Sequence, residues 1–393
     1  LLPLLLSLGV VSSLPEVVYN PDSVTLTPGE SSNFTLHSDP SINVTVTLFF
    51  NSSSSFSSVN SVVLPSNESV AVEVTALQPV NEEFFEVASC EVDGDPTSEC
   101  PLDLTASFAR VRIIHSHVLD VIVIIVGWAY FFAWSISFYP QIILNFQRKS
   151  VAGLNFDFVL LNTIGFASYT IYNCLIYFDP AVQAEYKAKY PRSPIPVLLN
   201  DVVFAAHAFL ACVVTGLQAI FMERENQRVS RVCIGYSIIL VLFGVVTSIL
   251  AGVNAMQLLR FVDCLSYIKL AVTLSKYFPQ AIFNWRRKST IGWSIGNILL
   301  DFTGGSLDLL QVALQGYNVD NFSAIIGNPV KFSLGLVSIV FDIVFMIQHY
   351  ILYRDAEVVD ARYEGIVNEA GPAPEEGREG EEDDNNSTDA LHL

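Results

Sequence analysis

The chain has 393 residues, of which 51% are hydrophobic and only 15% are charged, and its formal net charge is −19. This composition is typical of a membrane protein with a soluble part. The acidic balance excludes a nucleic-acid-binding surface, which needs clustered basic residues, so we expect no nucleic acid among the partners.

Residues 1–11 form an apolar run that is too short to cross a bilayer, and the small residues Ser12 and Ser13 follow it. This pattern is typical of the end of a signal peptide. We therefore interpret 1–14 as a signal peptide remnant, which implies a secretory route.

Residues 15–116 are rich in Ser, Thr, Val and Asn, and they alternate between apolar and polar types at 23–27 and 43–48. This alternation indicates half-buried strands and predicts a β-sandwich-like lumenal domain. Cys90 and Cys100 flank a short acidic loop and could close a disulfide in an oxidising lumen. Without clustered catalytic residues, the domain is best interpreted as a glycosylated shield or spacer. N-glycan acceptor triplets occur at Asn33, Asn43, Asn51, Asn67 and, further along the chain, Asn321.

Residues 117–355 contain seven apolar segments of about the length that a helix needs to cross a bilayer. With a lumenal amino terminus, an odd number of crossings places the carboxyl terminus in the cytosol. The basic turns at 148–149, 224–231 and 286–288 then fall on the cytosolic side, as the positive-inside rule requires. The expected spans are 118–139, 157–178, 201–222, 232–253, 259–283, 295–316 and 333–353.

A motif occurs twice within these spans, at 139–150 and 278–289, so the two copies are 139 positions apart. Each copy has a Pro-Gln pair near the end of an apolar run, followed by a basic turn. The repeat predicts an all-α fold of two parallel three-helix units joined by a linker helix. Proline in such a helix removes a backbone hydrogen bond, which makes it a candidate hinge, and the glutamine could satisfy the freed carbonyl groups. Static packing is the alternative role for the candidate hinge residues Pro140, Gln141, Pro279 and Gln280.

Several ionisable residues lie within the expected spans, where each is costly and is expected to face a cavity. Lys269 and Lys276 are about two helical turns apart. Asn297 and Asp301 are four positions apart and share a helix face, and Asp342 lies near the middle of the last span. Lysines opposite a carboxylate could bind a zwitterion at both of its charged ends.

A carboxylic acid that is removed from water favours its neutral form. Asp301 would therefore gain a proton from an acidic lumen and lose it to a neutral cytosol, which is a device for proton coupling. The same reasoning applies to Asp201 and Asp342. The alternative is that one or more of these acids form permanent ion pairs with Lys269 or Lys276.

The doubled Pro-Gln motif within seven expected spans resembles the PQ-loop transporter family, and in particular its lysosomal cystine–proton symporters. The resemblance covers about 127 to 353, whereas the predicted disulfide and the acidic tail depart from the family pattern. The segments that carry the resemblance are 134–141, 148–151, 200–202, 266–274, 276–280, 292–297, 300–305 and 338–342.

The resemblance implies proton-coupled export of cystine from the lysosome lumen to the cytosol by alternating access. It also implies a multi-pass protein of the lysosomal or vacuolar membrane, without enzyme activity, cofactor or metal. Cystine and protons are the implied partners, together with the proton pump and nutrient-sensing complexes. The implied cystine-site residues are Asn162, Lys269, Lys276, Asn284, Asn297 and Asp301, and the implied proton-coupling residues are Asp301, Asp201 and Asp342.

The segment 356–393 is expected to be an acidic, disordered cytosolic tail, because the residues after position 354 include 13 acidic and two basic ones. Family members carry a tyrosine-based sorting motif in this tail. The stretch from Tyr363 to Ile366 has the matching Tyr-x-x-apolar pattern.

Two other functions remain open at this stage. A PQ-loop exporter of cationic amino acids would share the fold, and it would be favoured if Lys269 and Lys276 pointed away from the cavity. A lysosomal membrane receptor or scaffold would bind a ligand without transporting it, and saturable flux would distinguish it from both carriers.

Overall fold

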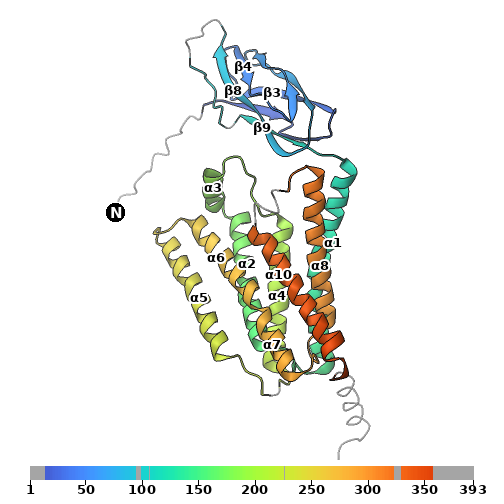
Figure 1. The fold of residues 1–393 in the computed structure, drawn as a ribbon. Coiled ribbons are helices and arrows are strands. Elements are labelled where there is room, and N and C mark those ends of the chain that lie inside the picture. The colour runs from blue at the N-terminus through green and yellow to red at the C-terminus, as the bar shows by residue number, and fades with distance from the viewer. Residues whose placement is uncertain (1–13, 94–98, 106, 225, 323–328, 357–393) are drawn as a thin grey trace, which may run out of the picture.

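The structure is a computed structural model that describes residues 14–93, 99–105, 107–224, 226–322 and 329–356, with only the backbone described for 329–334. A β domain lies at one end of a bundle of helices, and α1 leads from the domain into the bundle (Figure 1). The expected sorting motif at Tyr363 and Ile366 lies outside the described residues, as do the acidic tail and all but the last residue of the expected signal peptide.

The β domain is a sandwich of two sheets, with strand orders β1-β3-β7-β5 and β2-β9-β8-β4-β6. Buried residues alternate with exposed or half-buried ones along the strands, as the sequence predicts, because successive side chains point to opposite faces. Phe85 is fully buried between the sheets, where its ring stacks on Phe50 and meets Tyr19 edge-on. The strands are β1 (Glu16–Asn20), β2 (Ser23–Leu26), β3 (Ser31–Asp39), β4 (Val46–Phe50), β5 (Phe56–Ser58), β6 (Ser61–Leu64), β7 (Val70–Ala76), β8 (Val80–Val92) and β9 (Phe108–Ile113).

Two details of the domain bear on the sequence predictions. The strand expected at 43–48 begins only at Val46, so Asn43 lies in the preceding loop. Cys90 and Cys100 form the predicted disulfide, with 5.5 Å between their Cα atoms. The disulfide joins the end of β8 to the segment that precedes β9.

Two of the contacts between the β domain and the bundle reach helices beyond α1. Ser116, the N-cap of α1, donates its N–H to Asn318 Oδ1 at the end of α8 over 3.0 Å. Arg192, in the loop before α4, pairs with Glu86 of β8 over 2.7 Å and lies over the ring of Phe84. The domain therefore bridges helices that belong to the two halves of the bundle.

In the bundle, α1 packs along α8, α2 packs against α4 and α6, and α10 packs against α8. The helix α5 lies at the outside, where it contacts α6 and α2 (Figure 1). Large apolar side chains cover much of the outer surface, as expected for contact with lipid. The helices are α1 (His117–Arg148), α2 (Phe156–Phe178), α3 (Pro180–Lys189), α4 (Leu199–Phe221), α5 (Arg231–Gly252), α6 (Leu258–Ser275), α7 (Tyr277–Arg287), α8 (Ile295–Asn318), α10 (Pro329–Ile347) and the π-helical turn η1 (Gln348–Leu352).

Five helices among the described residues are long and apolar enough to cross a membrane: α1, α2, α4, α5 and the stretch Gly335–Leu352. The other two expected spans correspond to α8, which carries Asp301 and Asp308, and to α6 with α7. The helix α6 ends at Ser275, the residue whose carbonyl group the ring of Pro279 would meet in a continued helix. The count of seven spans therefore stays a prediction.

The chain between the second and third expected spans forms a helix that the sequence reasoning treated as a loop. The helix α3 begins after Asp179, whose side chain accepts hydrogen bonds from two N–H groups of the first turn, and Pro180 occupies the first helical position. Both are standard start signals.

Candidate functional site

The two repeats exchange hydrogen bonds at the end of the bundle that lies away from the β domain, which we call the PQ end. Gln141 Nε2 donates to the carbonyl of Gly292 over 2.9 Å, and Gln141 Oε1 accepts from the N–H of Ser294 over 2.8 Å. Gly292 and Ser294 belong to the turn between α7 and α8. The glutamine therefore binds the backbone of the other repeat. From the sequence we expect it to satisfy the carbonyl group freed by the proline in its own helix, and the structure shows a different partner.

The second repeat makes the same contacts in return. Gln280 Nε2 donates to the carbonyl of Gly153 over 3.0 Å, and Gln280 Oε1 accepts from the N–H of Asn155 over 2.7 Å. The two glutamines thus fill equivalent roles across a pseudo-symmetric contact. Each glutamine is almost fully buried, so these bonds are shielded from water.

Two asparagines and two further glutamines extend this network to the third helix of each repeat. Gln141 donates to Asn145, which donates to Gln218 of α4, and both distances are 2.8 Å. Gln280 donates to Asn284, which donates to Gln348 of η1, over 2.8 and 3.1 Å. We call these six residues the PQ latch: Gln141, Asn145, Gln218, Gln280, Asn284 and Gln348.

The latch also fixes how the third helices correspond. Gln218 and Gln348 are equivalent in their contacts, yet they are 130 positions apart, whereas the first two helices of the repeats correspond at 139. The first repeat is longer here because it contains α3 and its loop. The resemblance implies that Asn284 lines the cystine site, whereas in the structure its side chain bonds Gln280 and Gln348 in the latch.

Two glycines allow the turns at the PQ end to approach each other. Gly153 has a φ angle of +99° and Gly292 one of +88°, a region that favours glycine. A Cβ atom at Gly153 would collide with the carbonyl oxygen of Ile291, and one at Gly292 with that of Ala152. Both positions therefore need glycine for conformation and for space.

Lys276 lies at the break between α6 and α7 and points into the bundle. Its Nζ donates to Asn162 Oδ1 over 3.1 Å, and Asn162 Nδ2 donates to Cys212 Sγ over 3.2 Å. Lys269 Nζ lies 3.6 Å from the centroid of the Phe166 ring, which is a cation–π contact. Both lysines are therefore directed toward the first repeat. A cationic substrate would be favoured if they pointed away from the space between the repeats, so their direction does not favour it.

Two acids lie beside this lysine. Asp301 Oδ2 accepts hydrogen bonds from the hydroxyl groups of Tyr277 and Ser338 over 3.1 and 3.2 Å. Asp342 is fully buried, and neither of its carboxyl oxygens has a hydrogen-bond partner among the described residues. Lys276 interacts electrostatically with both acids. We call Asn162, Lys269, Lys276, Asp301 and Asp342 the central cluster.

The central cluster lies nearer to the PQ end than to the β domain, because Asn162 is six residues, or about 9 Å, into α2. Asn297 is half-buried one turn before Asp301 on α8. Asp201 lies apart, near the other end of the bundle, where its carboxylate accepts from the N–H of Leu198 over 2.9 Å. It is about 16 Å along α4 from Cys212.

Sequence reasoning gave no site role to several residues of these networks, among them Tyr277, Ser338, Gln218 and Gln348. Tyr277 and Ser338 lie in segments that carry the family resemblance, but neither was given a role, because neither is charged. Gln218 and Gln348 gave no signal, because the third helices of the repeats share no motif. The offset of 139 does pair Asn284 with Asn145, and that pairing could have indicated a common structural role.

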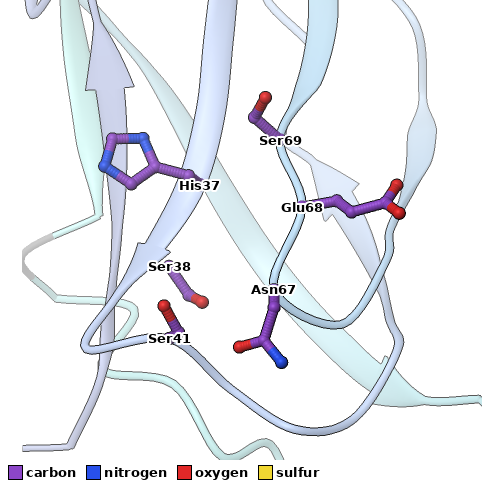
Figure 2. Close-up of a pocket in the computed structure, with 6 residues that line it drawn as sticks. All are labelled: His37, Ser38, Ser41, Asn67, Glu68 and Ser69. Atoms are coloured by element: carbon purple, nitrogen blue, oxygen red, sulfur yellow. The ribbon is translucent and has the colours of Figure 1, made fainter.

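The β domain contains a polar hollow of about 480 Å³, separate from the central cluster. Figure 2 shows the end of β3, with His37 and Ser38, on one side of it and the segment Asn67–Ser69 on the other. Asn67 Nδ2 also donates to Asn43 Oδ1 over 3.3 Å. The acceptors Asn33, Asn43, Asn51 and Asn67 are all exposed on the domain surface, and Asn321 lies just beyond α8.

A family model described as the PQ loop repeat matches the chain twice, at residues 122–182 and 261–321. The cystinosin homolog of Caenorhabditis elegans is 54% identical over 338 residues, covering 86% of this chain and 83% of the relative. Cystinosin of Bos taurus is 50% identical over 250 residues, covering 64% and 68%. The cystine transporter of Saccharomyces cerevisiae is 28% identical over 250 residues, covering 58% and 93%.

Two PQ-loop repeats, apolar helices long enough to cross a membrane and a buried polar cluster between the repeats define a membrane transporter, not an enzyme. At this level of identity and coverage, the chain belongs to the cystinosin family.

Proposed function

We propose that this protein exports cystine from the lysosome lumen to the cytosol in symport with protons. The observation that carries the proposal is the central cluster, in which Lys276, Asn162 and Asp342 are buried and lie with the half-buried Asp301 between helices of both repeats. Buried ionisable groups in a membrane bundle mark a substrate or proton pathway. The names of the relatives supply the substrate.

Cystine carries an ammonium and a carboxylate group at each of its two ends. Lys269 and Lys276 supply cations for its carboxylates, and Asp301 supplies an acceptor for an ammonium group. Asn162 adds an amide beside Lys276, and Asn297 adds a second amide one turn before Asp301 on α8. Because the equivalent of Asp301 in the first repeat is Asn162, the two halves of the substrate meet different partners.

Proton coupling follows from the acids of the central cluster. Asp342 is buried without a hydrogen-bond partner among the described residues, and buried acids in a membrane bundle mark proton pathways. Asp301 and Asp342 both interact electrostatically with Lys276, so a proton or an ammonium group that enters the cluster meets two acids and one cation. Asp201 would act separately, near the lumenal end of α4, where incoming protons arrive first.

Alternating access requires the PQ latch to open. In the proposed orientation the β domain is lumenal, seven spans cross the membrane, two parallel three-helix units face each other, and the PQ end is cytosolic. The reciprocal bonds of Gln141 and Gln280 then hold the cytosolic exit closed. Pro140 and Pro279 act as hinges, and the broken helix at Lys276 lies within one turn of the second hinge.

The test uses full-length protein with Tyr363→Ala and Ile366→Ala, which removes the proposed sorting signal and directs the protein to the cell surface. Its lumenal side then faces the bath, where labelled cystine uptake and inward current are recorded at acidic and neutral pH. Cystine-evoked current should grow with acidity and should be lost in Asp301→Asn. Thr303→Val, an exposed position on the same helix, is the matched control.

Surface protein that gives neither uptake nor current would overturn the assignment, and saturable uptake of lysine or arginine instead would move it to a cationic substrate. We place the protein in the lysosomal membrane, with glycans at the five acceptor asparagines. Its proposed protein partners are the proton pump and nutrient-sensing complexes.

A further inference from the structure

Cys212 of α4 is a buried thiol that borders the central cluster on the side of the first repeat. Its Sγ atom accepts a hydrogen bond from Asn162 Nδ2 over 3.2 Å, and Asn162 Oδ1 in turn accepts from Lys276. Cys212 also packs in one buried cluster with Phe166, which follows Asn162 by one turn of α2. The thiol therefore lies beside both residues of α2 that face the lysines.

The two lysines, on α6 and at its end, meet at the ring of Phe166. Lys269 Nζ lies 3.6 Å from the ring centroid, and Lys276 Nζ lies 5.8 Å from it. The lysines are about two helical turns apart along the chain, yet their ammonium groups are close enough to hold two carboxylates of one small molecule. Both ammonium groups also interact electrostatically with Cys212, so the thiol is near each of them.

The charges of the central cluster are not fully paired within the protein. Among the described residues, the ammonium group of Lys269 makes cation–π contacts with Phe166 and Tyr169 but no hydrogen bond or ion pair. Asp342 is fully buried, and in the same part of the chain its two carboxyl oxygens have no hydrogen-bond partner. Unpaired charges of both signs are costly inside a membrane bundle, so they indicate a ligand that carries both signs.

The pseudo-symmetry of the repeats shows how the thiol side differs from the acid side. At the offset of 139, Asn162 corresponds to Asp301, and at the offset of 130 that the PQ latch fixes, Cys212 corresponds to Asp342. The first repeat thus places an amide and a thiol where the second repeat places two acids. Its contribution beside the lysines is soft and uncharged, which suits an uncharged part of a substrate.

We propose that Cys212 contacts the disulfide of bound cystine and is a specificity-determining residue for this substrate. The proposal rests on the proposed function, in which Lys269 and Lys276 hold the two carboxylates. The disulfide is the midpoint between these carboxylates, so it lies near the thiol and the ring of Phe166. A disulfide has no strong hydrogen-bonding group, and sulfur packs favourably against polarisable and aromatic groups.

The first experiment captures this contact with S-(2-pyridylthio)cysteine, a probe that keeps one zwitterionic end and the disulfide of cystine. Attack by the Cys212 thiol joins its sulfur to the sulfur of the probe's cysteine. The S–S bond of the probe breaks, and 2-thiopyridone leaves with the electron pair and the thiol proton. Surface-directed, full-length protein with Cys174→Ala and Cys264→Ala is treated from the bath, and mass spectrometry identifies the modified peptide.

A half-cystine should attach to Cys212 and block cystine uptake, and a reductant should remove it and restore uptake. Cystine at ten times its KM should slow the attachment roughly tenfold, because it competes with the probe for one site. Cys233, a similarly buried thiol on α5 outside the central cluster, is the internal control and should stay unmodified. Uptake-competent protein in which Cys212 stays unmodified, or is modified equally fast with and without cystine, would overturn the proposal.

The second experiment measures selectivity in Cys212→Ser, which keeps an acceptor for Asn162 but places a hydroxyl group against the disulfide. The KM for cystine should rise roughly three- to tenfold, and kcat should change by less than about twofold. Preference for cystine over 2,7-diaminosuberic acid, which has methylene groups in place of the two sulfurs, should fall roughly threefold. Cys233→Ser is the matched control and should change neither quantity.

An unchanged KM for cystine in Cys212→Ser, or an unchanged preference between the two substrates, would count against the proposal. Absence of cystine uptake by the parent protein at every pH would instead refute the proposed function.

Discussion

The PQ latch leads to a sharp test, because replacing Gln280 with methionine preserves its size and removes its hydrogen bonds. The side chain of Gln280 is fully buried, and it bonds the N–H of Asn155, the carbonyl of Gly153 and the side chain of Asn284. In Gln280→Met these three groups stay buried without that partner while the PQ end is closed. When the PQ end opens, water satisfies them.

The expected shift in the equilibrium between the closed and open states follows from these three unpaired groups. If each unpaired group costs about 1 kcal/mol, the closed state loses about 3 kcal/mol relative to the open state. A difference of about 3 kcal/mol shifts the ratio of the two states by roughly 150-fold. A protein that is almost entirely closed at the PQ end should therefore become mostly open.

The assay is the distance between spin labels at Gln147 and Arg286, which are exposed and equivalent in the two repeats. Cys174 and Cys264 are first replaced by alanine to remove partly exposed thiols. The parent should give one short distance at the PQ end, and Gln280→Met should add a longer one that dominates.

The matched control is Gln311→Met, which removes one hydrogen bond from α8 to Val123, outside the PQ latch. This variant should keep the distance distribution of the parent. Gln141→Met should reproduce the effect of Gln280→Met, because the two glutamines make equivalent contacts. Distributions that are the same in the parent and in both latch variants would refute the reasoning.

Three further predictions follow. Asp301→Asn should abolish the acid stimulation of cystine uptake at the cell surface while leaving surface abundance unchanged, and retained acid stimulation would contradict the proton-coupling role. Gly292→Ala should lower the melting temperature through a destabilisation of about 2 kcal/mol or more, since the alanine is strained and collides with backbone, whereas Gly216→Ala, which has open space on a helix, should be neutral or stabilising. Hydrogen bonds from Thr27 and then His117 lower the pKa of Glu30 below its ordinary value of 4.5. The contribution of Glu30 to stability should thus be complete above pH 4.5 and lost as the pH falls through the lowered pKa, and melting curves of Glu30→Gln should lack this part of the acid dependence.

Much of the fold could be predicted from the sequence because the relevant signals are local. Alternation along 15–116 predicted the sandwich, and the spacing of Cys90 and Cys100 matched their disulfide. Long apolar segments indicated membrane helices, and the repeated Pro-Gln motif indicated two related halves. The cost of a charge in hydrocarbon was enough to select Lys276, Asp301 and Asp342, which the structure brings together.

The contacts between the halves were decided only by the tertiary structure. Gln141 and Gln280 bond backbone groups more than 120 positions away, and no local pattern predicts which turn lies opposite a given helix end. The same is true of Asn284, whose place in the latch depends on Gln348, and of Ser338, which reaches Asp301 only because α10 packs on α8. The sequence determined which residues are costly to bury in a membrane. The packing of one repeat on the other determined which hydrogen-bond and charge partners offset that cost.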